Sequence, residues 1–169
     1  MKVRPVAPED LQAAHEVTTE GLETYRTFAP PGWAPPTDLG AEGVAVRLAR
    51  EGAYGVVAVD EDAVVGFAAY EPAREAGDDG FTGPLIAGLA HVWAVFVAES
   101  HWGRGVATRL LGALIDDMRQ ARFPEARLYV AAGQARARRF YAREGWREVT
   151  APFFVGQLGL DLVEMRRSL

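Results

Sequence analysis

The strongest periodic pattern in the chain predicts a helix over residues 105–121. Apolar side chains recur there at intervals of three and four residues, at Leu110, Leu111, Leu114, Ile115 and Met118. This spacing places them on one face of a helix, which gives the segment a clear side to bury. Further patterns predict three more helices, over residues 9–22, 41–51 and 135–144.

Shorter apolar runs predict the strands, over residues 3–6, 54–60, 63–70, 89–97, 127–131, 146–149 and 160–165. Only Glu61 and Asp62 separate the second run from the third, which predicts an antiparallel hairpin. The 89–97 run is apolar on both faces, so we expect it at the centre of the sheet. The predicted order is βααβββαβαββ, an α/β fold with a mixed sheet. No repeat or linker divides the chain, and we expect one domain over residues 1–169.

Composition narrows the class of protein. With 169 residues, of which 49% are hydrophobic and 24% charged, the chain can bury a full core. The net charge of −5 indicates no general attraction to nucleic acid or to an anionic membrane. No signal-peptide run or membrane-spanning stretch is visible, so we expect a cytoplasmic protein. The chain has no cysteine and its 3 histidines lack metal-ligand spacing, so we expect no metal.

A glycine turn follows the 89–97 run and comes directly before the 105–121 helix. Its sequence is Trp102-Gly103-Arg104-Gly105-Val106-Ala107. Such a turn gathers backbone N–H groups at the positive end of a helix dipole, and that favours a pyrophosphate. A nucleoside-triphosphate loop would need a lysine, and a dinucleotide fingerprint would need glycine at Thr108. A tight turn without a ligand stays open as an alternative.

A second motif begins some thirty residues after the glycine turn. It is Gln134-x-x-Ala137-x-x-Phe140-Tyr141-x-x-x-Gly145-Trp146. Together, the two motifs resemble the signature of the GNAT superfamily of acyl-CoA-dependent N-acetyltransferases. The resemblance implies a central, mostly antiparallel twisted sheet flanked by helices. The chain departs from the family pattern at Trp102, Gln134 and Trp146, where Gln or Arg, Asn and Phe are usual.

The resemblance also implies acetyl-CoA as the acyl donor. In the family, the backbone of the central strand pairs with the pantetheine arm, and a backbone N–H, here of Val97 or its neighbour, stabilises the oxyanion. Tyr141 is implied as the acid that protonates the leaving thiolate, although a core aromatic beside Phe140 on one helix face stays open as an alternative. The implied donor contacts are Val95, Phe96, Val97, Trp102, Gly103, Arg104, Gly105, Val106, Ala107, Thr108, Gln134, Ala137, Phe140 and Tyr141. Because the chain has no cysteine, direct attack in a ternary complex is favoured over a cysteine thioester intermediate.

The general base and the acceptor pocket are less well defined. Glu71 and His91 are the best candidates for the base, directly or through water, although each residue type is more often structural. For the acceptor pocket we select the residues Tyr25, Phe28, Trp33, Glu71 and Phe153. With the carboxylates Asp38, Asp78 and Asp79 they would suit a cationic amine with apolar parts. An ordinary loop cluster explains the same residues equally well.

The prediction from sequence is an N-acetyltransferase that acts on a small-molecule amine. Acetylation of a protein N-terminus or of a lysine is the nearest alternative, and a CoA-binding regulatory module without catalysis is another. We expect no nucleic acid and no membrane as partners, and a homodimer is possible.

Overall fold

The structure, a computed structural model, describes residues 1–36, 40–76 and 82–169. The strands are β1 (Lys2–Pro5), β2 (Tyr54–Asp60), β3 (Ala63–Arg74), β4 (Leu85–Val97), β5 (Glu125–Ala131), β6 (Arg147–Glu148), β7 (Phe153–Val155) and β8 (Leu160–Ser168). The α-helices are α1 (Leu11–Glu23), α2 (Ala41–Leu48), α3 (Val106–Gln120) and α4 (Ala135–Arg143). Short 3₁₀ turns are η1 (Pro8–Asp10), η2 (Thr24–Thr27) and η3 (Glu99–His101).

One mixed sheet organises these elements. Its strand order is β1-β2-β3-β4-β5-β8-β6, and β7 pairs with β8. The pair β4–β5 is parallel, and the other pairs among the described residues are antiparallel. The mixed α/β sheet expected from the hydrophobic pattern is therefore confirmed, and β4 lies at its centre as predicted.

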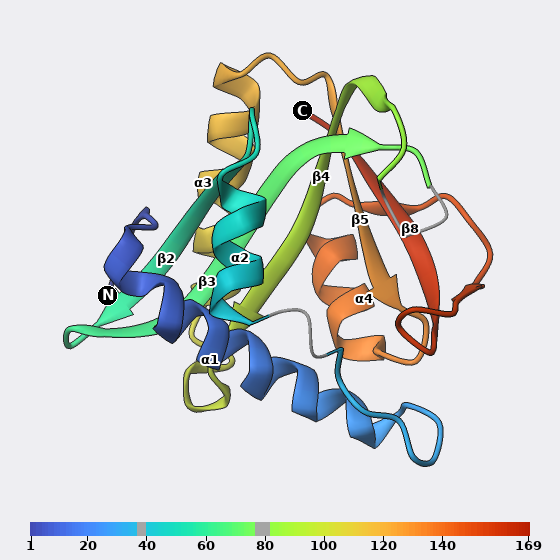
Figure 1. The fold of residues 1–169 in the computed structure, drawn as a ribbon, viewed down its shortest axis with the longest axis horizontal. Coiled ribbons are helices and arrows are strands. Elements are labelled where there is room, and N and C mark those ends of the chain that lie inside the picture. The colour runs from blue at the N-terminus through green and yellow to red at the C-terminus, as the bar shows by residue number, and fades with distance from the viewer. Residues whose placement is uncertain (37–39, 77–81) are drawn as a thin grey trace.

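Helices cover both faces of the sheet (Figure 1). Leu110, Leu111, Leu114 and Met118 of α3 are fully buried against one face, together with Ala68 and Tyr70 of β3. The alternate residues of β3, Phe67 and Ala69, face the other way and pack with Ala14 of α1 and Val44 of α2. Burying a side chain of leucine size contributes about 1.5–3 kcal/mol. The same two layers include Ala90 and Val92 of β4 on one face and Ala94 on the other, so they fix β4 between these helices.

The structure differs from the sequence prediction in detail. The first helix begins at Leu11, after the η1 turn. Strand β3 continues to Arg74 and β4 begins at Leu85, so both extend into the segment between the predicted 63–70 and 89–97 strands. The link between residues 151 and 159 contains an additional strand, β7. Three residues are too few to show a periodic pattern, so the sequence did not predict it.

Two kinds of feature are absent from residues 1–36, 40–76 and 82–169. None of the helices in those ranges is long and apolar enough to cross a membrane. Within the same ranges, no three His, Asp or Glu side chains are grouped as a metal site would require.

Candidate active site

The central feature of the site is a gap between β4 and β5. On one side, β4 pairs with β3 as far as Val97, opposite Gly66. On the other side, its pairing with β5 ends at Val92, opposite Leu128. The register with β3 shifts around Trp93, and this irregularity comes directly after the last β4–β5 pair, where the two central strands separate.

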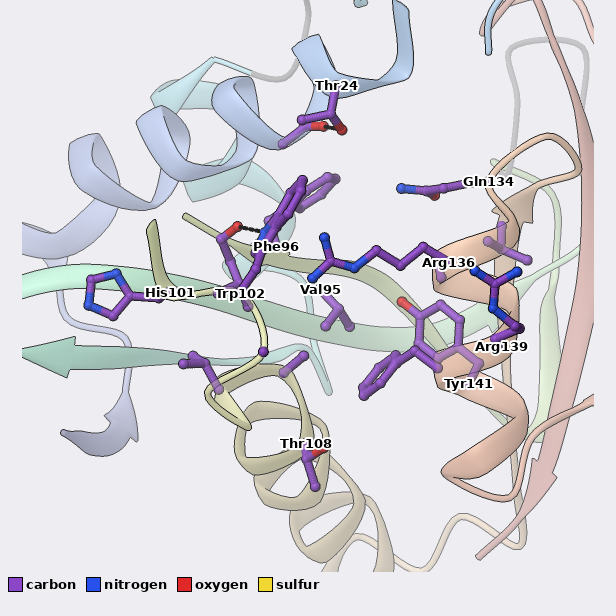
Figure 2. A pocket seen from close by; sticks show the side chains of 18 of the residues that line it. Thr24, Val95, Phe96, His101, Trp102, Thr108, Gln134, Arg136, Arg139 and Tyr141 are labelled. Atoms are coloured by element: carbon purple, nitrogen blue, oxygen red, sulfur yellow. Dashed lines mark hydrogen bonds between the residues drawn. The ribbon is translucent and has the colours of Figure 1, made fainter. Parts of the chain in front are cut away.

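The open edge of β4 presents backbone groups to this gap. Ala98 donates its N–H to the Val65 carbonyl, 3.0 Å away, which fixes the alternation of the antiparallel ladder. The N–H and C=O groups of Phe96 therefore face β3, and those of Val95 and Val97 face the gap. Trp102 already donates its indole N–H to the Val97 carbonyl at 2.8 Å (Figure 2).

The glycine turn connects β4 to α3. Gly103 and Gly105 have φ of 77° and 75°, and no atom lies within 4 Å of the position a Cβ would occupy at either. Positive φ favours glycine, which explains both residues locally. Gly105 is the N-cap of α3 and lines the cavity, so the first unpaired N–H groups of that helix are available at the cavity wall.

A cavity of about 520 Å³ occupies the space between the gap, the glycine turn and α4. It is lined by the sequence-predicted residues Tyr25, Val95, Phe96, Val97, Trp102, Gly103, Gly105, Val106, Ala107, Thr108, Gln134, Ala137, Phe140 and Tyr141. The tertiary structure thus brings together two motifs that are some thirty residues apart. Of the predicted donor contacts, Arg104 is not among the described residues that line the cavity.

The sequence analysis missed several lining residues, above all three arginines of α4. Arg136, Arg139 and Arg143 line the cavity together with His101, whereas no Asp or Glu is among the described lining residues. This contrasts with the net charge of −5 for the whole chain. The spacing of the arginines, at three and four residues within a predicted helix, is the signal that could have revealed them.

Arg136 extends from α4 across the cavity toward Trp102 (Figure 2). Its guanidinium lies 4.0 Å from the centre of the indole ring. A cation–π contact of this kind contributes about 0.5–1 kcal/mol at an exposed site. It links α4 to the glycine turn on the other side of the cavity.

Tyr25 and Tyr141 are two of the three phenols that line the cavity, and Tyr129 is the third. Tyr141, on α4, has ring contacts with Phe140 and Trp146, with centroids 5.1 Å and 6.1 Å apart within each pair. Burial raises the pKa of Tyr141, and the nearby Tyr25 adds to the effect. Burial also raises the pKa of Tyr25 to about 12, against a hydrogen bond with Gln134 that lowers it. Both phenols are therefore protonated at neutral pH.

The other predicted acceptor residues lie behind the cavity wall. Phe28 and Trp33 pack on Tyr25, with ring centroids 5.1 Å and 6.0 Å away, and Phe153 packs on Tyr129 at 5.7 Å. Phe28, Trp33 and Phe153 do not line the cavity, but Tyr25 and Tyr129 do. The predicted carboxylates Asp38, Asp78 and Asp79 lie outside the described residues.

Neither candidate base lines the cavity. Glu71 is buried and accepts hydrogen bonds from Arg47 and, at 2.9 Å, from Arg50. His91 lies opposite Glu71 in the β3–β4 register, and its ring centroid is 5.3 Å from that of Tyr129. The role of each as a base stays a prediction.

The environment of His91 predicts a pH dependence of stability. Burial, helped by the nearby Arg127 and Arg47, holds the pKa of His91 well below its usual 6.5. Below about pH 6.5 the unfolded chain binds a proton at His91 that the folded chain does not, so the free energy of unfolding falls as pH falls. We expect a loss of about 1.4 kcal/mol between about pH 7.5 and 5.5 from this group.

Urea unfolding of the native protein and of His91→Gln at both pH values measures this loss. Between these pH values the free energy of unfolding should decrease by about 1.4 kcal/mol less in the variant than in the native protein. Equal decreases in the two proteins would contradict a neutral, buried His91.

Comparison with known proteins identifies the family. A sequence model of the Acetyltransferase (GNAT) family matches residues 19–146, more than half of the chain. A search of curated protein sequences gives no match. The chain belongs to the GNAT acetyltransferase family, as the two motifs indicated, and is an acyltransferase.

Solved structures of this family are similar over the whole chain. The ribosomal-protein-alanine N-acetyltransferase from Brucella melitensis is 25% identical, with a TM-score of 0.77 and 100% of both chains covered. The PaiA N-acetyltransferase from Thermoplasma acidophilum, in complex with coenzyme A, is 18% identical, with a TM-score of 0.77 and coverage of 99% of this chain and 98% of that one. The ribosomal-protein-S18-alanine N-acetyltransferase from Escherichia coli is 18% identical, with a TM-score of 0.69 and coverage of 99% and 92%. At 18% identity, the last two support the fold alone.

Proposed function

We propose that this protein transfers an acetyl group from acetyl-CoA to a primary amine of a small molecule. The observation that carries the proposal is the cavity itself. In an acidic chain, it has arginines and a helix N-terminus on its walls, and no carboxylate among its described lining residues. Such a cavity favours a polyanionic donor, and coenzyme A, the ligand of the similar Thermoplasma structure, is one.

The glycine turn would hold the diphosphate of the donor. Backbone N–H groups at the start of α3 donate to phosphate oxygens, and the absence of Cβ atoms at Gly103 and Gly105 lets the phosphates approach. The pantetheine arm would then pair with the open edge of β4. Of the groups of Val95 and Val97 that face the gap, the Val97 carbonyl is already engaged by Trp102.

The reaction is a direct attack in a ternary complex. The amine nitrogen forms a bond to the thioester carbon, and the oxyanion accepts a hydrogen bond from the Val97 N–H. Loss of one such donor typically costs about 10²–10³ in rate. The C–S bond then breaks, and the departing thiolate takes the phenolic proton of Tyr141, which its raised pKa keeps in the acid form.

The proton lost by the amine needs a base. His91 is neutral at neutral pH because its pKa is lowered, and the neutral imidazole is the form that accepts a proton. Both oxygens of Glu71 are bound by arginines. Because neither residue lines the cavity, we propose that water carries the proton to one of them.

The acceptor is proposed as a small amine that meets Tyr25 and Tyr129 on the cavity wall, with Phe28, Trp33 and Phe153 supporting those rings. Glu71 is buried and bound by two arginines, so it would lie near the acceptor without contacting it. The second candidate acceptor is the N-terminal alanine of a protein. The name of the Brucella structure, 25% identical over the full length, favours it.

The remaining predictions are proposed on the same basis. Residues 1–169 form one domain that acts in the cytoplasm without nucleic acid or membrane. The net charge of −5 supports the lack of attraction to anionic polymers. A homodimer stays possible.

A thiol-release screen tests the function. Acetyl-CoA is offered with a panel of amino acids, polyamines and aminoglycosides, and in parallel with peptides that begin with alanine. We expect release of free CoA with at least one small amine, at a rate well above hydrolysis without an acceptor. Turnover with peptides alone would replace the small amine with a protein N-terminus. Binding of CoA without turnover of any amine would favour the regulatory module.

A further inference from the structure

One face of α4 presents cations to the cavity. Arg136, Arg139 and Arg143 are separated by three and four residues and all line it. Arg138 belongs to another face of the helix, where it binds both carboxylate oxygens of Glu148 and the Ala132 carbonyl. One face of α4 therefore makes structural contacts through Arg138, and another face turns its three arginines to the cavity.

A contact at the C-terminal end of α4 links this helix to the start of α3. Thr108, in the first turn of α3, donates its hydroxyl to Glu144 Oε1 at 2.9 Å, and Glu144 directly follows α4. Arg143, the last residue of α4, is thus next in sequence to a residue bound to the start of α3. Arg136, near the other end of the helix, contacts Trp102 instead.

Arg139 and Arg143 add positive charge to the cavity beyond what the glycine turn itself offers. The turn offers backbone N–H groups and the α3 dipole to that diphosphate. Among the described residues, neither arginine has a carboxylate within salt-bridge distance. Guanidinium groups bind phosphate with two parallel hydrogen bonds, so two of them on the wall opposite the turn suit a further phosphate.

We propose that Arg139 and Arg143 recognise the 3′-phosphate of the donor and so determine specificity for CoA over 3′-dephospho-CoA. The inference rests on the proposed function, because it takes the donor to be a CoA thioester. It goes further, because it assigns the third phosphate to two residues at positions that the second motif leaves unspecified. The two arginines act on donor affinity and not on the chemical step.

Titration calorimetry with CoA and with 3′-dephospho-CoA tests this proposal. We expect the native protein to bind CoA about ten- to a hundredfold more tightly, the range for one or two charge-assisted hydrogen bonds. The double variant Arg139→Gln with Arg143→Gln should bind CoA only as well as dephospho-CoA. Its affinity for dephospho-CoA should stay within about twofold of the native value, and this also verifies that it folds.

Arg138→Gln is the matched control, since it removes an arginine of the same helix from the face with structural contacts. It should keep the native preference for CoA. Equal native affinity for the two ligands, or an unchanged preference in the double variant, would overturn the proposal and leave the acetyltransferase function intact. If the native protein bound neither ligand, the proposed function would fail with it.

Discussion

A Tyr141→Phe variant turns over at least about a hundredfold more slowly than the native protein and binds CoA with an unchanged Kd. General acids typically contribute about 10²–10⁴ in rate. Phenylalanine keeps the ring contacts with Phe140 and Trp146 and removes only the oxygen. The loss should therefore fall on kcat. Steady-state thiol release with an acceptor from the screen measures kcat, and calorimetry measures Kd.

Tyr25→Phe is the matched control, because Tyr25 is another phenol with a raised pKa on the cavity wall. We expect it to raise the acceptor KM and to lower kcat less than about tenfold. Because burial raises the pKa of Tyr141, native kcat should not decline through loss of its proton below about pH 10. Two results would remove Tyr141 from the role of acid. One is a kcat loss below threefold in Tyr141→Phe, and the other is a kcat loss in Tyr25→Phe that exceeds the loss in Tyr141→Phe.

A Gly105→Asp variant loses CoA affinity by about a hundredfold or more. Gly105 has a φ of 75°, a conformation that costs a residue with a Cβ about 1–2 kcal/mol. It also lines the cavity, where a carboxylate at the N-cap of α3 would compete for the same N–H groups and repel the diphosphate. Calorimetry at up to millimolar CoA gives the Kd.

Gly32→Asp separates these effects from general damage. Gly32 also has a positive φ, 81°, with no atom within 4 Å of a Cβ, and it is not among the described lining residues of the cavity. The control should keep the native Kd for CoA within about twofold. Gly105→Ala adds backbone strain without charge, so its Kd for CoA should lie between the values for Gly32→Asp and Gly105→Asp. If Gly105→Asp bound CoA normally, the diphosphate site would have to be sought elsewhere.

Much of the fold could be predicted because its signals are local. The apolar positions of α3 repeat on one helix face, and all of Leu110, Leu111 and Leu114 are fully buried. The 89–97 run is apolar on both faces, and β4 is paired on both sides. Strand β7 was not predicted, because its three residues are too few to show a periodic pattern.

The part of the candidate site that lies in or beside the two motifs could be predicted. The part where side chains from distant segments meet could not. Of the fourteen residues predicted to contact the donor, thirteen line the cavity, whereas the arginine face of α4 was not predicted. For the acceptor side, composition suggested Phe28, Trp33 and Phe153. Their rings support Tyr25 and Tyr129 and do not line the cavity.

By itself, the sequence determined the order of the elements, the glycine turn and the family, because periodicity and short motifs depend on neighbours along the chain. Only the tertiary structure decided where β4 leaves β5, which backbone groups face the gap, and that α4 turns three arginines toward it. These features depend on the register of paired strands and on the rotation of a packed helix. Both are set by contacts between residues that are far apart in the sequence.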